Sequence, residues 1–201
     1  MLQHIRPAVV LLILFSALTG LVYPLAVTGI AQLAFPRQAN GSLVEKNGVV
    51  VGSALIGQNF KTDHYFHPRP SATTDTDPND STKTIDAPYN AANSSGSNFG
   101  PTSQKLVDRV KAAVEAWRAK AGPGPVPADA VTTSASGLDP DISPENALAQ
   151  VPAVAKARGL DEARVRALVE GAIERPTFGW IGEPHVNVLQ LNLALDELKS
   201  S

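Results

Sequence analysis

The chain has 201 residues, of which 43% are hydrophobic, and this composition excludes a disordered protein and is enough for one folded domain or two small ones. The formal net charge is −2, without the basic face that phosphate contacts require, so we expect no nucleic-acid partner. The chain has no cysteine, which excludes disulfides, thiol catalysis and cysteine-ligated zinc.

The first feature along the chain is an uncharged apolar stretch over residues 8–35, which follows a short tail of residues 1–7. It is longer than the roughly 20 residues that a helix needs to cross a bilayer. A cleavable signal peptide is the alternative, but its apolar core usually has about 7–15 residues, and no small-x-small cleavage site follows at the right distance. We therefore predict a transmembrane helix over residues 8–35.

The charges beside this stretch bear on its orientation. Arg6 and the terminal amine precede it, and Arg37 follows it. Positive flanking charges favour the cytoplasmic side of a membrane. The small excess of positive charge before the stretch predicts a cytoplasmic N-terminus and an extracytoplasmic domain.

Small or weakly polar residues recur every four positions within the predicted helix, at Ser16, Gly20, Pro24 and Thr28. Such residues let a second membrane helix approach closely, because lipid gives little hydrophobic reason for helices to associate. The alternative is that membrane helices simply tolerate small residues and proline. We predict that these four residues form a face that packs against a partner helix.

Residues 36–201 are expected to form the soluble domain. Branched apolar residues predict short strands over 49–51 and 54–56. Residues 68–101 are rich in Ser, Thr, Asn, Asp, Gly and Pro and are expected to be one long polar surface loop.

Helices dominate the rest of the chain. The half after the polar loop shows apolar residues at three- and four-residue spacing, first at Leu106, Val110, Val114 and Trp117. Ser143 and Asp161 are expected to cap the second and third of these helices, and glycine ends the first two. A Pro/Gly linker is expected over 122–128, and Pro152 is expected to kink or split the second helix. The order of elements predicts a single N-terminal transmembrane helix plus one α+β (mixed) soluble domain. The predicted helices cover residues 102–120, 143–158, 161–174 and 188–198.

No phosphate-binding loop or dinucleotide fingerprint is present in the sequence. Four residues of the polar loop have approximately the spacing of a calcium-binding loop. However, Asp80 stands where such a loop needs glycine, and the positive charge of Lys83 would repel a bound cation. His64 and His67 are three residues apart, but Pro68 disfavours a helix there and Arg69 repels a metal ion. We expect no metal site and assign no catalytic or cofactor-binding residue. The four calcium-like residues are Asp75, Asp77, Asn79 and Asp86.

Several phrases of the sequence, taken together and in order, resemble one family. They occupy residues 23–25 (YPL), 38–43 (QANGSL), 52–60 (GSALIGQNF), 65–72 (YFHPRPSA), 134–139 (SASGLD), 154–158 (VAKAR) and 186–196. The chain resembles the C subunit of the bacterial Kdp potassium-transporting P-type ATPase from about residue 6 to 198. It departs from the family pattern at Pro68, where glycine is expected, in a long acidic segment over 73–101, and at His185.

The resemblance implies an accessory subunit of the inner membrane that is not itself an enzyme. Its partners would be a channel-like potassium-translocating subunit and a P-type ATPase subunit, to which ATP and magnesium would belong. The family's C subunit stabilises the complex and is described as a catalytic chaperone that raises the affinity of the ATPase subunit for ATP. A periplasmic domain does not reach cytoplasmic ATP, so this effect would be allosteric.

Two readings from other classes stay open at this stage. One is a membrane-tethered extracytoplasmic hydrolase that uses Ser136 and His185, although the sequence has no Gly-x-Ser-x-Gly elbow. The other is a free-standing extracytoplasmic sensor or binding module. Purification from native membranes separates these readings, since a subunit brings two larger membrane proteins with it.

Overall fold

The computed structural model describes residues 2–198, and the backbone alone at Leu2. The chain divides into two compact units, residues 1–53 and residues 54–201. Each unit is described by itself.

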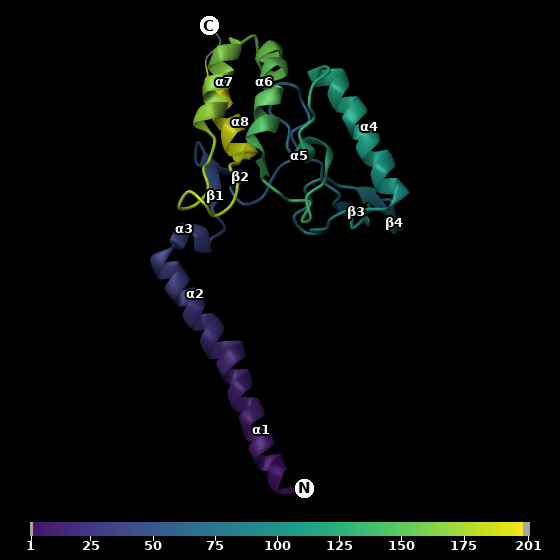
Figure 1. Cartoon of the computed structure of the whole chain (residues 1–201). Coiled ribbons are helices and arrows are strands. Elements are labelled where there is room, and N and C mark those ends of the chain that lie inside the picture. The colour runs from purple at the N-terminus through teal and green to yellow at the C-terminus, as the bar shows by residue number, and fades with distance from the viewer. Residues whose placement is uncertain (1, 199–201) are drawn as a thin grey trace. The chain divides into compact units, whose positions relative to one another are not determined.

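The first unit begins with one long helix, shown at the start of the chain in Figure 1. It consists of α1 (Leu2–Ala17), a π-helical turn η1 (Leu18–Val22) and α2 (Tyr23–Ala34). From Gln3 to Ala34 this helix is long and apolar enough to cross a membrane, and none of its most apolar window is buried within the protein. The predicted fold class is confirmed, because one apolar N-terminal helix precedes a region of mixed helix and strand.

The π-helical turn lies directly before Pro24. A proline ring clashes with the carbonyl group four residues earlier and has no N–H group to bond it, and here that carbonyl belongs to Gly20. The helix adapts by a wider turn, in which the N–H group of Tyr23 donates to the carbonyl oxygen of Leu18. Proline therefore alters the helix locally without ending it.

A short helix and a β-hairpin complete the first unit. α3 (Pro36–Ala39) is followed by the antiparallel strands β1 (Leu43–Lys46) and β2 (Val49–Ser53). Asn47 and Gly48, both with positive φ, form the two-residue turn that such hairpins favour. The predicted strand over 49–51 is confirmed, whereas the one over 54–56 is wrong, because Ala54 and Leu55 form a turn instead.

The second unit contains a second hairpin inside the segment that was predicted to be a loop. Strands β3 (Thr74–Asp77) and β4 (Asp80–Asp86) pair antiparallel. The prediction that residues 68–101 form one long loop is therefore wrong. Alternating Thr and Asp residues give this hairpin no apolar face, so hydrophobic patterning carries no signal for it.

The helices of the second unit follow their predicted positions closely. They are α4 (Gln104–Ala121), α5 (Ala128–Val131), α6 (Pro144–Arg158), α7 (Glu162–Gly171) and α8 (Val188–Glu197). The side chains of Ser143, Asp161 and Asn187 cap α6, α7 and α8 by accepting hydrogen bonds from backbone N–H groups. Helix α5 and the two-residue strands β5 (Asp141–Ile142) and β6 (Val186–Asn187) were not predicted.

Two details of these helices differ from the predictions. Pro152 does not split α6, which continues through it and keeps the proline on its exposed side. Helix α7 ends at Gly171 rather than Glu174, because the backbone of Glu174 instead pairs with His185 in an isolated bridge.

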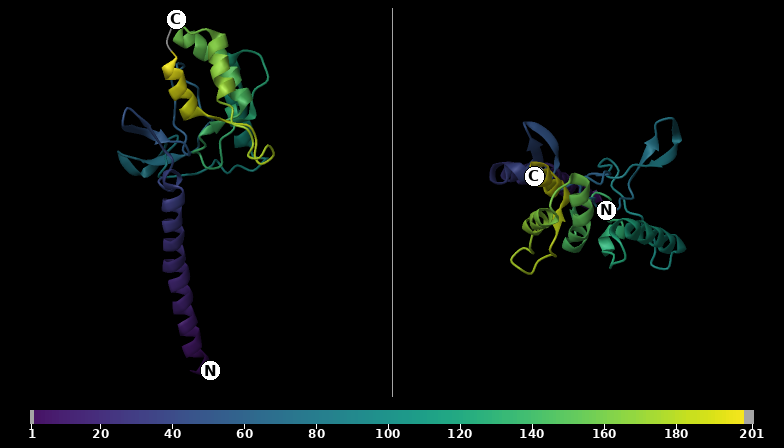
Figure 2. Two further views of the ribbon diagram at one scale, coloured as in Figure 1. Left: turned by 90° about the vertical axis from the view of Figure 1, so that its left-hand side faces the viewer. Right: turned by 90° about the horizontal axis from the view of Figure 1, so that it is seen from above.

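The core of the second unit lies among α6, α7 and α8, which lie side by side in Figures 1 and 2. Valine and leucine side chains of all three helices meet there. Phe66, from the extended segment before β3, is completely buried in the same cluster. The main members from the helices are Val151, Val154, Val165, Val169, Leu191 and Leu195.

Candidate functional site: a pocket between α4 and α6

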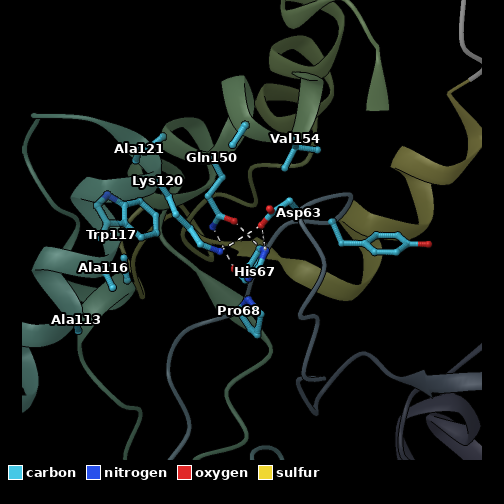
Figure 3. A pocket seen from close by; sticks show the side chains of 14 residues that line it. Asp63, His67, Pro68, Ala113, Ala116, Trp117, Lys120, Ala121, Gln150 and Val154 are labelled. Atoms are coloured by element: carbon cyan, nitrogen blue, oxygen red, sulfur yellow. Dashed lines mark hydrogen bonds and ion pairs between the residues drawn. The ribbon is translucent and has the colours of Figure 1, made fainter. Parts of the chain in front are cut away.

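A pocket of about 300 Å³ lies between α4, α6 and the extended segment around His67 (Figure 3). Its wall is formed by small apolar side chains of α4, α5 and α6 and by the indole of Trp117. Alanines leave this space because their side chains are too short to fill the gap between the two helix axes. The alanines that line it are Ala113, Ala116, Ala121, Ala130, Ala149 and Ala153.

Three ionisable side chains meet at this pocket. The Nζ atom of Lys120 lies 3.2 Å from Oδ1 of Asp63, and Nε2 of His67 lies 3.7 Å from the same oxygen. Burial, together with the nearby charge of Lys120, lowers the pKa of His67, and Asp63 only partly opposes this. His67 is therefore neutral at pH 7, while Lys120 and Asp63 form an exposed ion pair that contributes little stability.

The backbone beside the pocket is held by a side-chain amide of α6. Gln150 accepts a hydrogen bond from the N–H group of His67 at 2.7 Å and donates one to its carbonyl oxygen at 3.1 Å. The same amide nitrogen lies 2.9 Å from Oδ1 of Asn146. Asn146 in turn donates to Asp129, which also accepts from the backbone and hydroxyl of Ser143 at the start of α6.

An amide of α8 holds the adjacent residue in the same way. Asn192 accepts from the N–H group of Phe66 at 2.8 Å and donates to its carbonyl oxygen at 3.0 Å. Gln150 and Asn192 thus replace the two neighbouring strands that an extended segment would have in a sheet. The buried backbone polar groups of Phe66 and His67 are satisfied by these four bonds.

Ionic contacts hold the two ends of the same segment. Arg158 of α6 donates to the carbonyl oxygen of His64, lies 4.7 Å over the ring of Tyr65, and pairs with Asp196 of α8 at 2.7 Å. Further along, Arg69 pairs with Asp139 at 2.8 Å. Each pair is partly buried, and its charge-assisted hydrogen bonds help to fix the position of this segment.

Tyr89 also contacts the backbone of Arg69. Its hydroxyl donates to the carbonyl oxygen of Arg69 at 2.7 Å. Burial, together with the nearby charge of Asp139, raises the pKa of Tyr89 well above its usual range. Tyr89 is therefore a neutral hydrogen-bond donor under all physiological conditions.

The pocket combines a mostly apolar wall with one exposed ion pair. None of the described residues that line it is a serine, threonine or cysteine, so the nucleophiles of these three types are absent from the described lining. The pocket was not predicted from the sequence, because alanines on three helices that are distant along the chain form no recognisable motif. The neighbouring phrase at residues 65–72 was the only sequence signal for this region.

The four residues considered for a calcium site lie on the β3–β4 hairpin, two near its open end and two near its turn. Asp75 and Asp77 are on β3, Asn79 is in the turn, where its N–H group is bonded by Asp77, and Asp86 is at the far end of β4. His67 lies beside the cation of Lys120. Among residues 2–198 there is no group of three or more His, Cys, Asp or Glu side chains that could hold a metal ion.

The two residues considered for hydrolysis have separate partners. The hydroxyl of Ser136 accepts a hydrogen bond from the N–H group of Leu138 at 3.1 Å. The ring of His185 faces two carboxylates, with Nε2 at 3.8 Å from Glu174 and 3.9 Å from Asp141. Burial raises the pKa of Asp141, which the charge of His185 partly opposes. No contact between Ser136 and His185 is present in the described structure.

The π-helical turn brings three of the four small residues of the membrane helix closer to one line than a regular α-helix would. A four-residue step overshoots one α-helical turn by about 40°. The π-helical turn holds more residues, so the steps from Ser16 to Gly20 and Pro24 come closer to whole turns. A β-carbon added at Gly20 would meet no atom within 4 Å, so this position is open to an approaching helix. Thr28 lies one further step along, in α2.

Comparison with known proteins gives a single family. The sequence model described as "K+-transporting ATPase, c chain" (KdpC) matches residues 5–197. The chain is 64% identical over 198 residues to the potassium-transporting ATPase KdpC subunit of Methylobacterium nodulans, covering 98% of both proteins. It is 63% identical over 196 residues to that of Bradyrhizobium diazoefficiens, again covering 98% of both, and 62% identical over 198 residues to that of Methylorubrum populi, with the same coverage. The match spans the membrane helix and the soluble region alike, and the chain belongs to the KdpC family, the c chains of K+-transporting ATPases.

Proposed function

We propose that this chain is a non-catalytic accessory subunit of an ATP-driven potassium uptake pump. The observation that carries the proposal is the family match, which begins in the membrane helix and continues to the last helix of the domain. In this proposal the chain assembles with a channel-like potassium-translocating subunit and a P-type ATPase subunit in the inner membrane. It stabilises the complex, and ATP and magnesium bind to the ATPase subunit.

The absence of catalytic motifs in the sequence supports a non-catalytic role. Phosphoryl transfer requires positioned cationic donors around metal-held phosphates. The sequence has neither a Gly-rich phosphate loop nor an Asp-Lys-Thr-Gly phosphorylation phrase. The effect on the pump's affinity for ATP is therefore proposed to be indirect, through contacts that differ between states of the pump.

This part of the proposal predicts that the purified full-length chain in detergent binds magnesium-ATP weakly, with no saturation in the low micromolar range, and hydrolyses none. Isothermal titration calorimetry measures the binding directly. With the pump subunits present, the chain is expected to shift the ATP dependence of the ATPase. Saturable micromolar binding to the chain alone would replace the allosteric account by a nucleotide site on this subunit.

The membrane helix is proposed to pack on a partner through Ser16, Gly20, Pro24 and Thr28. Gly20→Leu is expected to reduce the amount of the two larger subunits that co-purify with the chain severalfold, because the added side chain separates the helix backbones. Leu12→Phe, outside this face, is the control and is expected to have a smaller effect. Equal assembly of both variants would rule out this face, and the absence of both larger subunits from the wild-type preparation would rule out the proposed function.

The orientation is also a proposal, based on Arg6 before the helix and Arg37 after it. We propose that residues 1–7 are cytoplasmic, that the helix over about 8–35 spans the membrane, and that residues 36–201 are periplasmic. Protease added to intact spheroplasts is expected to digest the domain while a cytoplasmic marker protein stays intact. Digestion only after lysis would show the opposite orientation.

A further inference from the structure

The segment from Glu174 to His185 forms a structured projection, which we call the aromatic hairpin. Its base is closed by Glu174 and His185, whose N–H and carbonyl groups bond each other at 2.8 and 3.1 Å. Nearer the tip, Thr177 and Ile181 exchange the same pair of bonds at 2.9 and 3.0 Å. In both views of Figure 2 this loop, coloured yellow-green, extends away from α7 and α8. The tip is thus an ordered element.

The tip presents its two aromatic side chains to solvent. Phe178 is 84% exposed and Trp180 is 77% exposed, the highest values among the large hydrophobic residues described in the second unit. Phe178 has a φ of 55°, in the left-handed region that a bulky residue rarely adopts. The backbone is therefore held in an unfavourable conformation that keeps an aromatic ring outside the core.

The chemistry of the tip is that of a membrane–water interface. No charged residue occurs from residue 176 to residue 182, and Ile181 adds a further half-exposed apolar side chain. Tryptophan is enriched at bilayer interfaces, because its ring is apolar and its N–H group still needs a polar partner. Charged residues return on either side at Arg175 and Glu183, where the hairpin would leave the interface.

The base of the hairpin is linked to the membrane helix by the chain itself and by one hydrogen bond within each unit. In the first unit, Ser53 at the end of β2 donates to the carbonyl oxygen of Gly41 at 2.7 Å. Gly41 is seven residues after Ala34, where α2 ends. Ala54 follows directly. In the second unit, Asn187 donates to the carbonyl oxygen of Ala54 at 2.9 Å, and Asn187 is two residues from the base of the hairpin. Along this path of covalent links and hydrogen bonds, few residues separate the end of α2 from the base of the hairpin.

We propose that the aromatic hairpin is a second membrane contact of this subunit, with Phe178 and Trp180 inserted at the boundary between lipid headgroups and acyl chains. A bilayer is a better occupant than a protein surface for a narrow tip, since stable protein interfaces bury about 1,200–2,000 Å² in total and require shape complementarity. Lipid requires only apolar area and a short tether. The contact would restrict the orientation of the domain relative to the bilayer, a property beyond the proposed accessory role.

The two tryptophans of the chain make the test specific, since none lies in the membrane helix. Trp117→Phe leaves Trp180 as the single emitter, and Trp180→Phe leaves Trp117, which lines the pocket between α4 and α6. Both full-length variants are placed, without other subunits, in nanodiscs of phosphatidylethanolamine and phosphatidylglycerol with plain or brominated acyl chains. Far-UV circular dichroism confirms that each variant is folded, and the wild-type chain provides the sum of both emissions.

A membrane contact predicts about twofold weaker Trp180 emission in brominated than in plain nanodiscs, because an interfacial indole touches the acyl chains. Trp117 emission is expected to be the same in both. Phe178→Ser on the Trp117→Phe background is expected to reduce the quenching of Trp180. Unquenched Trp180 that stays accessible to aqueous iodide would overturn the proposal. Protection from iodide that appears only after the pump subunits are added would also overturn it, and would identify the hairpin as a protein contact.

Discussion

Gly137→Ala is expected to lower the free energy of unfolding of the soluble region by about 3 kcal/mol, from backbone strain of about 1–2 kcal/mol and overpacking of about 1–3 kcal/mol. Gly137 has a φ of +68°, and a β-carbon there would lie 2.6 Å from the carbonyl oxygen of Ser95. The glycine is held by a bond from its N–H group to the hydroxyl of Ser134 at 2.8 Å and by one from Ser71 to its carbonyl oxygen at 2.7 Å. Ser95 is also held in place, because its N–H group donates to the carbonyl oxygen of Ser136 at 3.0 Å.

Gly159→Ala is the matched control for this prediction. Gly159 ends α6 with nearly the same φ, +64°, but an added β-carbon would meet no atom within 4 Å. This variant isolates the backbone strain, expected at about 1 kcal/mol. Urea unfolding of the full-length chain in mild detergent, followed by circular dichroism, measures both. Equal losses for the two variants would show that the packing around Gly137 yields to the added methyl group.

Asn192→Ala is expected to cost about 3–4 kcal/mol, since each buried polar group left without a partner costs about 1–3 kcal/mol. Asn192 is 2% exposed, and its amide satisfies both backbone groups of Phe66, which is itself completely buried. Removal of the amide leaves the N–H and carbonyl groups of Phe66 unpaired in an apolar cluster. The extended segment that forms one side of the pocket would lose one of its two amide contacts.

Asn93→Ala provides the comparison for Asn192. Asn93 also donates to a backbone carbonyl, that of Thr74 at 2.9 Å, but it is exposed, so water replaces the lost bond. Its expected cost is under about 1 kcal/mol. Thermal unfolding of both variants measures the difference between their losses of stability. A similarly small loss of stability for Asn192→Ala would indicate that water enters the core and forms hydrogen bonds with the backbone of Phe66.

Elements with a local apolar pattern were predicted well. The long apolar run is a single uninterrupted helix, and the periodicity of Leu106, Val110, Val114 and Trp117 corresponds to α4, in which all four are half-buried. The caps at Ser143 and Asp161 begin α6 and α7 as predicted. The family was also recognised from short phrases, and the match over residues 5–197 confirms it.

Predictions failed where an element has no local apolar pattern or where its stabilisation comes from distant parts of the chain. The Thr- and Asp-rich hairpin β3–β4 has no apolar periodicity, and β5 and β6 are two residues each, paired between Asp141 and Asn187. Pro152 was expected to interrupt α6, but packing of Val151 and Val154 in the core stabilises the helix on both sides of it.

Sequence patterning was sufficient for the membrane helix, the main helices and the family, because apolar periodicity and capping act between residues that are near neighbours along the chain. The pocket, the amide bonds to Phe66 and His67, and the exposed aromatic hairpin followed only from the folded chain. Asn192 is 126 residues from Phe66, and Gln150 is 83 from His67. Only burial by the surrounding helices makes these polar contacts necessary, since in water the same backbone groups would be satisfied by solvent.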